Sequence, residues 1–211
     1  MENMRTTSQK SSEELKTRTP KRQRGHDRVV ILLEAAARVF ARKGYDAATM
    51  TEIAVEAHSS IGSLYQFFPT KPLLAEALHI DRLERLKAGL RDMAERSADL
   101  SAADSGEAIF DALGIFIEEY PEFAVLAGRR DIPKERKARS RAELKELIAN
   151  VLRQAQPPIS DDIGLMSGIV LELLRITVVV SSEPDAAEDR RVVGELRLML
   201  RKRLEEAAAA G

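Results

Sequence analysis

Residues 59–71, SSIGSLYQFFPTK, combine side chains that can bind a nucleic acid with side chains that can anchor a short helix. The chain has six Phe, three Tyr and no Trp, yet Tyr65, Phe67 and Phe68 fall within four residues. The phenol of Tyr65 and the amide of Gln66 can reach phosphate oxygens or the edges of bases. Backbone amides at the start of a helix can also face phosphates. The segment therefore indicates a short helix with one polyanion-binding face.

Three short helices are predicted to position these side chains, at 28–43, 50–57 and 61–67. Helices of this length are not stable alone, so they must pack on one another and on a fourth predicted helix, 72–96. The second and third are joined by only a few residues. This is the helix-turn-helix arrangement, in which the second helix of the pair enters the major groove of DNA.

Local signals set the ends of these helices. Gly44 stands where a glycine commonly ends a helix. Thr49 and Glu52 have the spacing of a capping box, in which each side chain binds a backbone amide of the other. Ser60 and Thr70 can cap the third and fourth helices through their hydroxyl groups. The boundaries of the predicted helix-turn-helix follow from these residues.

An ordered set of residues runs through the predicted helices 28–43, 50–57 and 61–67 and into the fourth. Its members are Ala36, Phe40, Gly44, Tyr45, Thr49, Ile53, Ala54, Gly62, Leu64, Tyr65, Phe68, Lys71 and Leu74. With this set, residues 28–75 resemble the DNA-binding domain of the TetR/AcrR family of bacterial transcription regulators. The resemblance covers about a quarter of the chain. The remainder is similar to the family only in length and all-helical character.

The resemblance implies a role for each residue that matches the family pattern. Thr49 caps its helix and touches a phosphate, and Lys71 binds a phosphate at the start of the fourth helix. The other implied contacts are with the DNA backbone (Ser60, Ser63 and Tyr65) and the groove floor (Ile61, Gly62 and Gln66).

His58 departs from the family pattern, which usually has glycine in the turn. Glycine adopts positive φ freely, whereas histidine does so at a cost. Two interpretations stay open: His58 is a tolerated turn residue, or it contacts a phosphate.

A basic run precedes the first predicted helix. Residues 1–75 contain twelve Lys or Arg and eight Asp or Glu, a net charge of +4, so the remainder carries −5. We expect residues 1–27 to form a flexible arm. Its Lys21, Arg22 and Arg24 are candidates for DNA contacts, although a solvated tail would have the same composition.

The remaining sequence predicts further helices and an all-α fold. They span about 105–120, 122–129, 135–155, 161–181 and 186–208. We therefore expect an arm at 1–27, a three-helix DNA-binding domain at 28–74, and a helical domain for ligand binding and dimerisation at 75–211.

The resemblance implies a regulatory ligand pocket in the C-terminal part, and aromatic residues there are candidates for its lining. Binding pockets are mostly apolar with a few placed polar groups. Arg175 lies among apolar neighbours in IVLELLRITVVV, where it either pairs with Glu172 or binds an anionic ligand. Arg129 and Arg130 are further candidate polar groups. The candidate lining residues are Phe110, Phe116, Tyr120, Phe123, Met166 and Arg175.

The last two predicted helices are candidates for a homodimer interface. Helix 161–181 is apolar on most sides and must be covered on two faces, either by its own chain or by a second copy. Gly164 and Gly168 would allow a close approach of helices. The last helix would contribute Val192, Leu196, Met199 and Leu200.

Composition excludes several classes of function. The chain has no Cys, so it has neither disulfides nor thiol chemistry. Its three His show no ligand spacing, and no Gly-rich phosphate loop, HExxH or GxSxG motif occurs. We expect no enzymatic activity, no metal, no cofactor and no membrane insertion, and a cytoplasmic location.

Together with these observations, the resemblance implies a homodimeric regulator, most simply a repressor, that binds a pseudo-palindromic operator in double-stranded DNA. A small molecule of unknown identity in the C-terminal part would release it. One alternative is a helical adaptor that has lost DNA recognition, which only His58 suggests. A helical enzyme is a second alternative, without a catalytic motif to support it.

Overall fold

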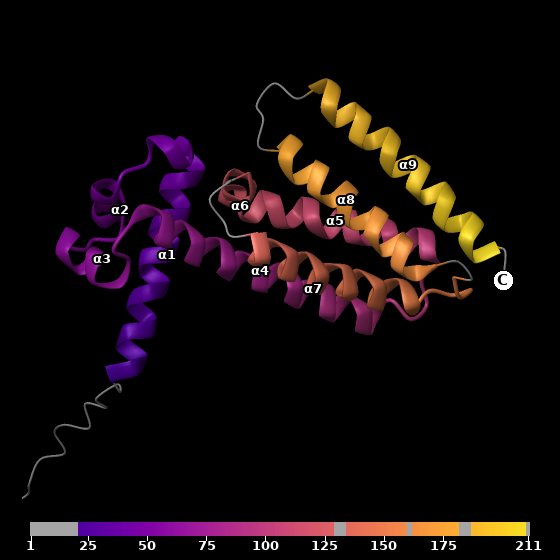
Figure 1. Cartoon of the computed structure of the whole chain (residues 1–211), viewed down its shortest axis with the longest axis horizontal. Coiled ribbons are helices and arrows are strands. Elements are labelled where there is room, and N and C mark those ends of the chain that lie inside the picture. The colour runs from indigo at the N-terminus through magenta and orange to yellow at the C-terminus, as the bar shows by residue number, and fades with distance from the viewer. Residues whose placement is uncertain (1–20, 129–133, 160–161, 182–186, 210–211) are drawn as a thin grey trace, which may run out of the picture.

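The computed structural model describes residues 21–128, 134–159, 162–181 and 187–209, and these residues form helices without any strand (Figure 1). The predicted all-α fold is thus confirmed. The helices are α1 (Lys21–Ala47), α2 (Met50–Glu56), α3 (Ile61–Phe67), α4 (Lys71–Arg96), α5 (Ala102–Glu119), α6 (Pro121–Ala127), α7 (Lys134–Arg153), α8 (Ile163–Ser181) and α9 (Ala187–Ala209).

The helices form two groups that α4 connects (Figure 1). Helices α1 to α3 and the start of α4 share one buried cluster, which includes Phe40 and Leu64 and also takes in Leu126 from α6. The rest of α4 and helices α5 to α9 share a second buried cluster. Along α4, Leu78 belongs to the first cluster and Leu83 to the second. The predicted domain boundary at 74/75 stays a prediction.

Helix α1 begins earlier than expected. It starts at Lys21, so residues 21–27, which the sequence placed in a flexible arm, are helical. The polar segment around Gly25 contains no proline and therefore does not force the helix to begin later. The helix breaks at Gly44, whose φ of 77° is a conformation that glycine adopts without steric cost.

The predicted caps are confirmed. The Glu52 amide donates to Thr49 Oγ1 at 3.2 Å, and the Thr49 amide donates to Glu52 Oε2 at 3.1 Å, which completes the capping box of α2. Ser60 Oγ accepts from the Ser63 amide at the start of α3, and Thr70 Oγ1 accepts from the Leu73 amide at the start of α4. The termini of α2, α3 and α4 are thus fixed by local hydrogen bonds as well as by packing.

Helix α8 is apolar enough and long enough to cross a membrane by composition alone, and 33% of the span is buried within the chain. It packs against α7 on one side and α9 on another. A core helix of a soluble protein has the same composition, so α8 is weak evidence for a membrane.

Candidate DNA interface and internal cavity

Helix α3 has one face exposed to solvent and is held to the rest of the domain by buried side chains. Leu64 is fully buried and Phe68 nearly so, and both pack in the cluster formed by α1, α2 and α4. Tyr65 is 47% exposed, and Gln66 is exposed beside it. The further predicted contact residues Ser60, Ile61 and Gly62 are exposed and Ser63 is half-buried. The structure therefore places all six predicted contacts of the α3 segment where an external partner can reach them.

Gly62 is not needed for packing within the chain. A Cβ added at this position would meet no atom within 4 Å. A larger side chain would fit in the isolated protein but would keep a partner surface away from the helix. The glycine therefore agrees with a close approach of α3 to another molecule.

The turn before α3 has the geometry of a Schellman motif. The His58 amide donates to Val55 O at 3.0 Å, and the Ser59 amide donates to Ala54 O at 2.9 Å. His58 has a φ of 47° and is exposed. It thus occupies the left-handed position that glycine usually takes at the end of a helix, and the turn keeps its normal hydrogen bonds. A contact between His58 and a phosphate stays a prediction.

Helix α2 is fixed to α1 by ion pairs. Arg38 Nε and Arg42 Nη2 donate to the two oxygens of Glu56 at 2.7 and 3.2 Å, and Lys43 pairs with Glu52. Arg38 and Arg42 hold the pKa of Glu56 below its usual range. These cations are therefore used to orient α2.

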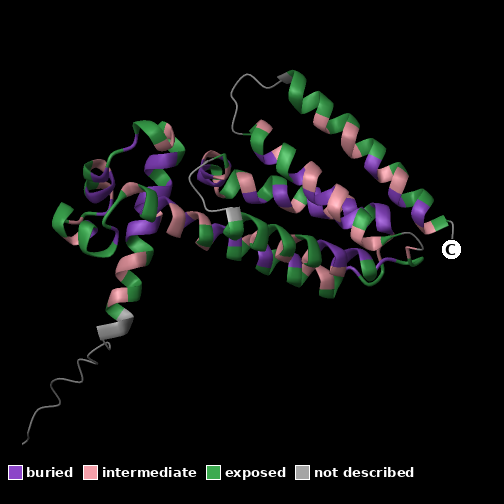
Figure 2. Ribbon diagram, viewed as in Figure 1, coloured by how far each residue is buried: buried purple, intermediate pink, exposed green. Residues whose placement is uncertain are grey.

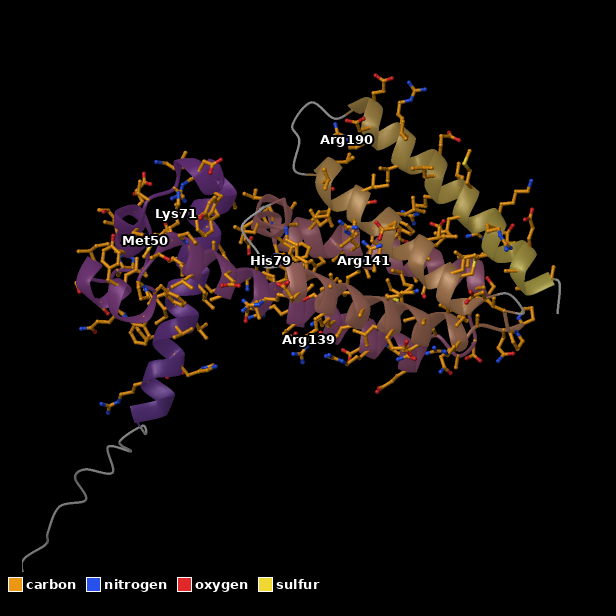
Figure 3. All side chains as sticks on the ribbon, viewed as in Figure 1. Met50, Lys71, His79, Arg139, Arg141 and Arg190 are labelled. Carbon is orange, nitrogen blue, oxygen red and sulfur yellow. The ribbon has the colours of Figure 1, made fainter. Side chains whose placement is uncertain are left out.

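Lys71 is engaged by carbonyl groups of its own chain. Its ammonium donates to Tyr45 O, Asp46 O and Ala48 O at 2.9, 3.1 and 2.9 Å and lies 4.6 Å from the centre of the Tyr45 ring (Figure 3). An ammonium has three protons, and three carbonyl groups accept them here. The structure therefore uses Lys71 to close the turn after Gly44, and the expected phosphate contact stays a prediction.

Thr49 is exposed, but its hydroxyl is engaged within the capping box. Oγ1 accepts from the Glu52 amide and donates to Glu52 Oε2 at 3.0 Å. In this conformation the hydroxyl proton is directed to the chain itself, and the expected phosphate contact stays a prediction.

The first turns of α1 carry the remaining predicted contacts. Arg24 is exposed, whereas the side chains of Lys21 and Arg22 and the whole of residues 1–20 lie outside the described part of the structure. Arg28 Nη2 donates to Ser59 Oγ at 2.5 Å, which ties α1 to the turn before α3. The basic start of α1 is thus connected to the turn that precedes the candidate recognition helix.

A cavity of about 770 Å³ lies in the second helical group, between α4, α5, α6, α7 and α8. Phe116, Phe123 and Arg175 line it, as predicted. Three other predicted lining residues do not: Phe110 and Met166 are buried in the core, and Tyr120 packs on Phe116 and over the guanidinium of Arg82. Arg129 and Arg130 lie outside the described residues.

Arg175 forms the predicted pair with Glu172. The Arg175 Nη1 to Glu172 Oε2 distance is 2.7 Å, and Arg141 from α7 pairs with the other oxygen of the same carboxylate. Although its neighbours in sequence are apolar, the Arg175 side chain is 58% exposed.

Arg82 is a functional candidate that the sequence analysis missed. It is 1% exposed and connects three helices. Its Nε donates to Glu122 Oε1 of α6 at 2.7 Å, and Nη1 and Nη2 donate to the two oxygens of Glu34 of α1 at 3.0 and 3.1 Å. The sequence did contain a signal for it. Along α4, a row at every fourth residue is leucine except at one position, where an arginine stands: Leu74, Leu78, Arg82, Leu86 and Leu90.

The candidate dimer residues divide into exposed and internal positions. Val192 and Met199 are exposed and Leu196 is half-buried, whereas Leu200 is buried in its own chain. Gly164 and Gly168 point toward α7, since a Cβ at Gly168 would lie 3.7 Å from Lys145 Cε. Their expected role as points of approach for a second copy is therefore not supported.

Comparison with known proteins supports the predicted resemblance. A sequence model described as bacterial regulatory proteins, tetR family, matches residues 32–78, which comprise most of α1, all of α2 and α3 and the start of α4. A search of curated protein sequences found no significant match.

Solved structures of bacterial regulators have the same fold. A transcriptional regulator from Cytophaga hutchinsonii superposes with a TM-score of 0.65 at 18% identity, over 83% of this chain and 97% of that one. A TetR-family transcriptional regulator from Streptomyces coelicolor gives 0.62 at 24% identity, over 85% and 99%. A TetR-family regulator from Marinobacter aquaeolei gives 0.58 at 20% identity, over 86% and 97%. The predicted resemblance is thus confirmed: residues 32–78 match the model of the tetR family of bacterial regulatory proteins, and the all-helical fold is shared with solved structures of bacterial transcriptional regulators.

Proposed function

We propose that the protein is a transcriptional repressor that binds operator DNA as a homodimer and is released by a small molecule in the α4–α8 cavity. The exposed face of α3 is the observation that carries the proposal. A short helix with Tyr65 and Gln66 outward and Leu64 inward suits insertion into the major groove, where side-chain donors and acceptors meet base edges. Helix α3 itself contains no acidic residue that would repel phosphates.

The cavity supports control by a ligand. Its volume of about 770 Å³ lies in the range typical of small-molecule sites. Residues from α4 form one wall, and the same helix begins beside α3, so a ligand that shifts α4 also shifts the DNA-binding helices. Arg82 on α4 binds Glu34 on α1 and Glu122 on α6, so a shift of α4 would be transmitted directly to α1. Control requires that the ligand bind one of the two arrangements more tightly.

A second copy of the chain is the proposed partner of α8 and α9. Figure 2 shows much of the outer surface of α9 as exposed. The two helices also expose apolar side chains to solvent, namely Val179 of α8 and Val192, Leu198 and Met199 of α9. Pairing these two helices with their copies would bury that surface in a two-fold four-helix interface. It would also place two α3 helices on the two halves of a pseudo-palindrome.

The geometry of His58 weakens the alternative of an adaptor without DNA recognition. That alternative depended on a distorted turn, and the turn before α3 has normal hydrogen bonds. A regulator that binds operator DNA must reach the chromosome, so the proposed function implies a cytoplasmic location.

DNA binding is tested by selecting sequences from a random duplex pool with the full chain, followed by fluorescence anisotropy on the selected duplex. Tyr65→Ala and Gln66→Ala should each weaken binding at least about tenfold without a change in thermal stability, because each residue is expected to lose a contact with DNA. Ile115→Ala is the control, since Ile115 is exposed on α5 in the second helical group. A chain that selects no sequence, or variants that bind like wild type, would refute the proposed interface.

The homodimer is tested by sedimentation equilibrium of a Val192→Glu, Met199→Glu double variant. The two charges should convert a dimer to a monomer, because each would be buried in the interface without a partner. Lys202→Glu, at an exposed polar position of α9, makes a similar charge change and should leave the dimer intact. A wild-type monomer would contradict the proposed assembly.

A further inference from the structure

The cavity wall is apolar but carries an excess of positive charge. Its charged lining residues are Arg85, Arg96, Arg136, Lys137, Arg141 and Arg175, against a single carboxylate, Glu76. Most of the remaining lining consists of Leu, Ile, Phe, Met, Val and Ala side chains. An apolar body with a negatively charged group would therefore complement this wall.

Two of the lining cations already have carboxylates of their own. Arg136 pairs with Glu76, and Arg85 Nε donates to Asp81 Oδ2 at 2.9 Å. Because Glu76 is the single lining carboxylate and is occupied in this way, the described wall offers a cationic ligand no carboxylate without an existing partner.

Between α7 and α8 the charges do not balance. Arg141 and Arg175 bind opposite oxygens of one carboxylate, Glu172, which leaves the group of three with a net charge of +1. Both guanidiniums belong to residues that line the cavity, and their side chains are 53% and 58% exposed. They therefore mark a place where the apolar cavity meets solvent.

We propose that the cavity binds an amphipathic anion, with its apolar body against the Leu and Phe side chains and its carboxylate or phosphate on Arg141 and Arg175. The proposal rests on the ligand control proposed above and names the chemical class of that ligand. Guanidinium groups bind such anions through two parallel hydrogen bonds. A head group at the solvent edge keeps part of its hydration, so little of its desolvation cost is incurred.

Displacement of a neutral fluorescent probe by ligands of similar chain length distinguishes the contribution of the head-group charge to binding from that of the apolar chain. The full-length protein is equilibrated with N-phenyl-1-naphthylamine, and the probe is displaced by decanoate, decyl phosphate, decan-1-ol or decylammonium, all below their micelle concentrations. Decanoate or decyl phosphate should displace the probe at a concentration at least about tenfold lower than decylammonium does. The better of the two anions identifies the head group.

The Arg141→Gln, Arg175→Gln double variant should remove this preference and leave displacement by decan-1-ol unchanged. The Lys version, Arg141→Lys, Arg175→Lys, should retain part of it because the charges remain. Arg139→Gln is the matched control on α7, since Arg139 is 84% exposed, pairs with Glu143 and does not line the cavity. Equal displacement by decanoate and decylammonium, or an unchanged preference in the double variant, would overturn the proposed anion class.

Gly89→Leu shows whether the probe reports on the cavity. Gly89 lines it, and a Cβ there would meet no atom within 4 Å, so the new side chain should occupy cavity space and reduce probe binding. Equal displacement by all four compounds, together with this loss, would refute the anion class and keep the cavity as a ligand site. If Gly89→Leu left probe binding unchanged, both the anion class and the cavity as a ligand site would be refuted. DNA binding is measured separately by anisotropy, so that part of the proposed function is tested independently.

Discussion

Arg82 Nε lies 2.7 Å from Glu122 Oε1 in the interior, while the other edge of the same guanidinium binds both oxygens of Glu34. Burial alone would lower the pKa of Arg82, but the hydrogen bonds that its guanidinium donates to Glu34 and Glu122 hold the pKa above its ordinary value. The guanidinium therefore stays charged, and this buried cation connects α4 to α1 and α6.

Replacement of Arg82 by leucine should strongly destabilise the protein. Glu122, which is 3% exposed, would lose its partner inside the protein, and such a change costs about 3–5 kcal/mol. Arg85→Leu is the matched control one turn away on α4, because its pair with Asp81 is half exposed and should cost under about 1 kcal/mol. Urea unfolding measures both. Equal losses for the two variants would show that burial of Arg82 does not decide its contribution.

His58→Gly should stabilise the protein by up to about 1 kcal/mol. The positive φ at this position costs histidine more free energy than glycine. Glycine also raises the conformational entropy of the unfolded chain, which offsets part of the stabilisation. His58→Val should act in the opposite direction, since a β-branched residue fits this backbone region poorly. Both values come from thermal unfolding. If valine were tolerated as well as glycine, the turn would not have the observed geometry in solution.

Lys71→Met separates a structural lysine from a phosphate-binding one. Loss of three carbonyl contacts should lower the free energy of unfolding by about 1–3 kcal/mol. The salt dependence of DNA affinity should keep its slope, because no phosphate contact is removed. A slope that falls by about one unit would instead restore the role that the sequence suggested.

The helix-turn-helix could be predicted because its signals are local. Thr49, Ser60 and Thr70 lie directly before the helices that they cap, and Gly44 marks the break in α1. The start of α1 could not be fixed in the same way, since the polar residues before Arg28 are compatible with a helix or a tail. The carbonyl contacts of Lys71 could not be predicted because its acceptors lie more than twenty residues away in sequence.

The cavity was predicted only in part, because clustering in sequence does not determine where each side chain points. Phe116 and Phe123 line the cavity, but Tyr120 lies between them in sequence and packs over Arg82 instead. Arg141 was missed because the shared carboxylate that places it beside Arg175 belongs to another helix. Such pairs depend on how helices pack, which periodicity does not specify.

Glu143→Gln should destabilise the protein at neutral pH and lose its effect in acid. Lys87 and Arg139 hold the pKa of Glu143 below its usual range. A lowered pKa gives stability that is complete above the unfolded value near about 4.3 and is lost as the pH falls through the folded value. The difference in Tm between variant and wild type should therefore shrink as the pH is lowered from 7 toward 3.

Glu146→Gln provides the control for that experiment. Glu146 lies on the same helix and pairs with Arg153, but its side chain is 64% exposed, whereas Glu143 binds the buried Lys87. The control should change Tm less than Glu143→Gln does at pH 7. A difference between Glu143→Gln and wild type that stayed constant down to pH 3 would mean that the ionised carboxylate contributes nothing to Tm.

The exposed face of α3 is tested most directly by anisotropy with a selected operator duplex that carries single base-pair changes. Wild type should discriminate among base pairs, whereas Gln66→Ala should lose discrimination at one position in each half-site, at a cost of about 1–3 kcal/mol for the preferred base pair, and keep its salt slope. If Gln66→Ala retained the full base preference of wild type, α3 would not be the helix that reads the DNA.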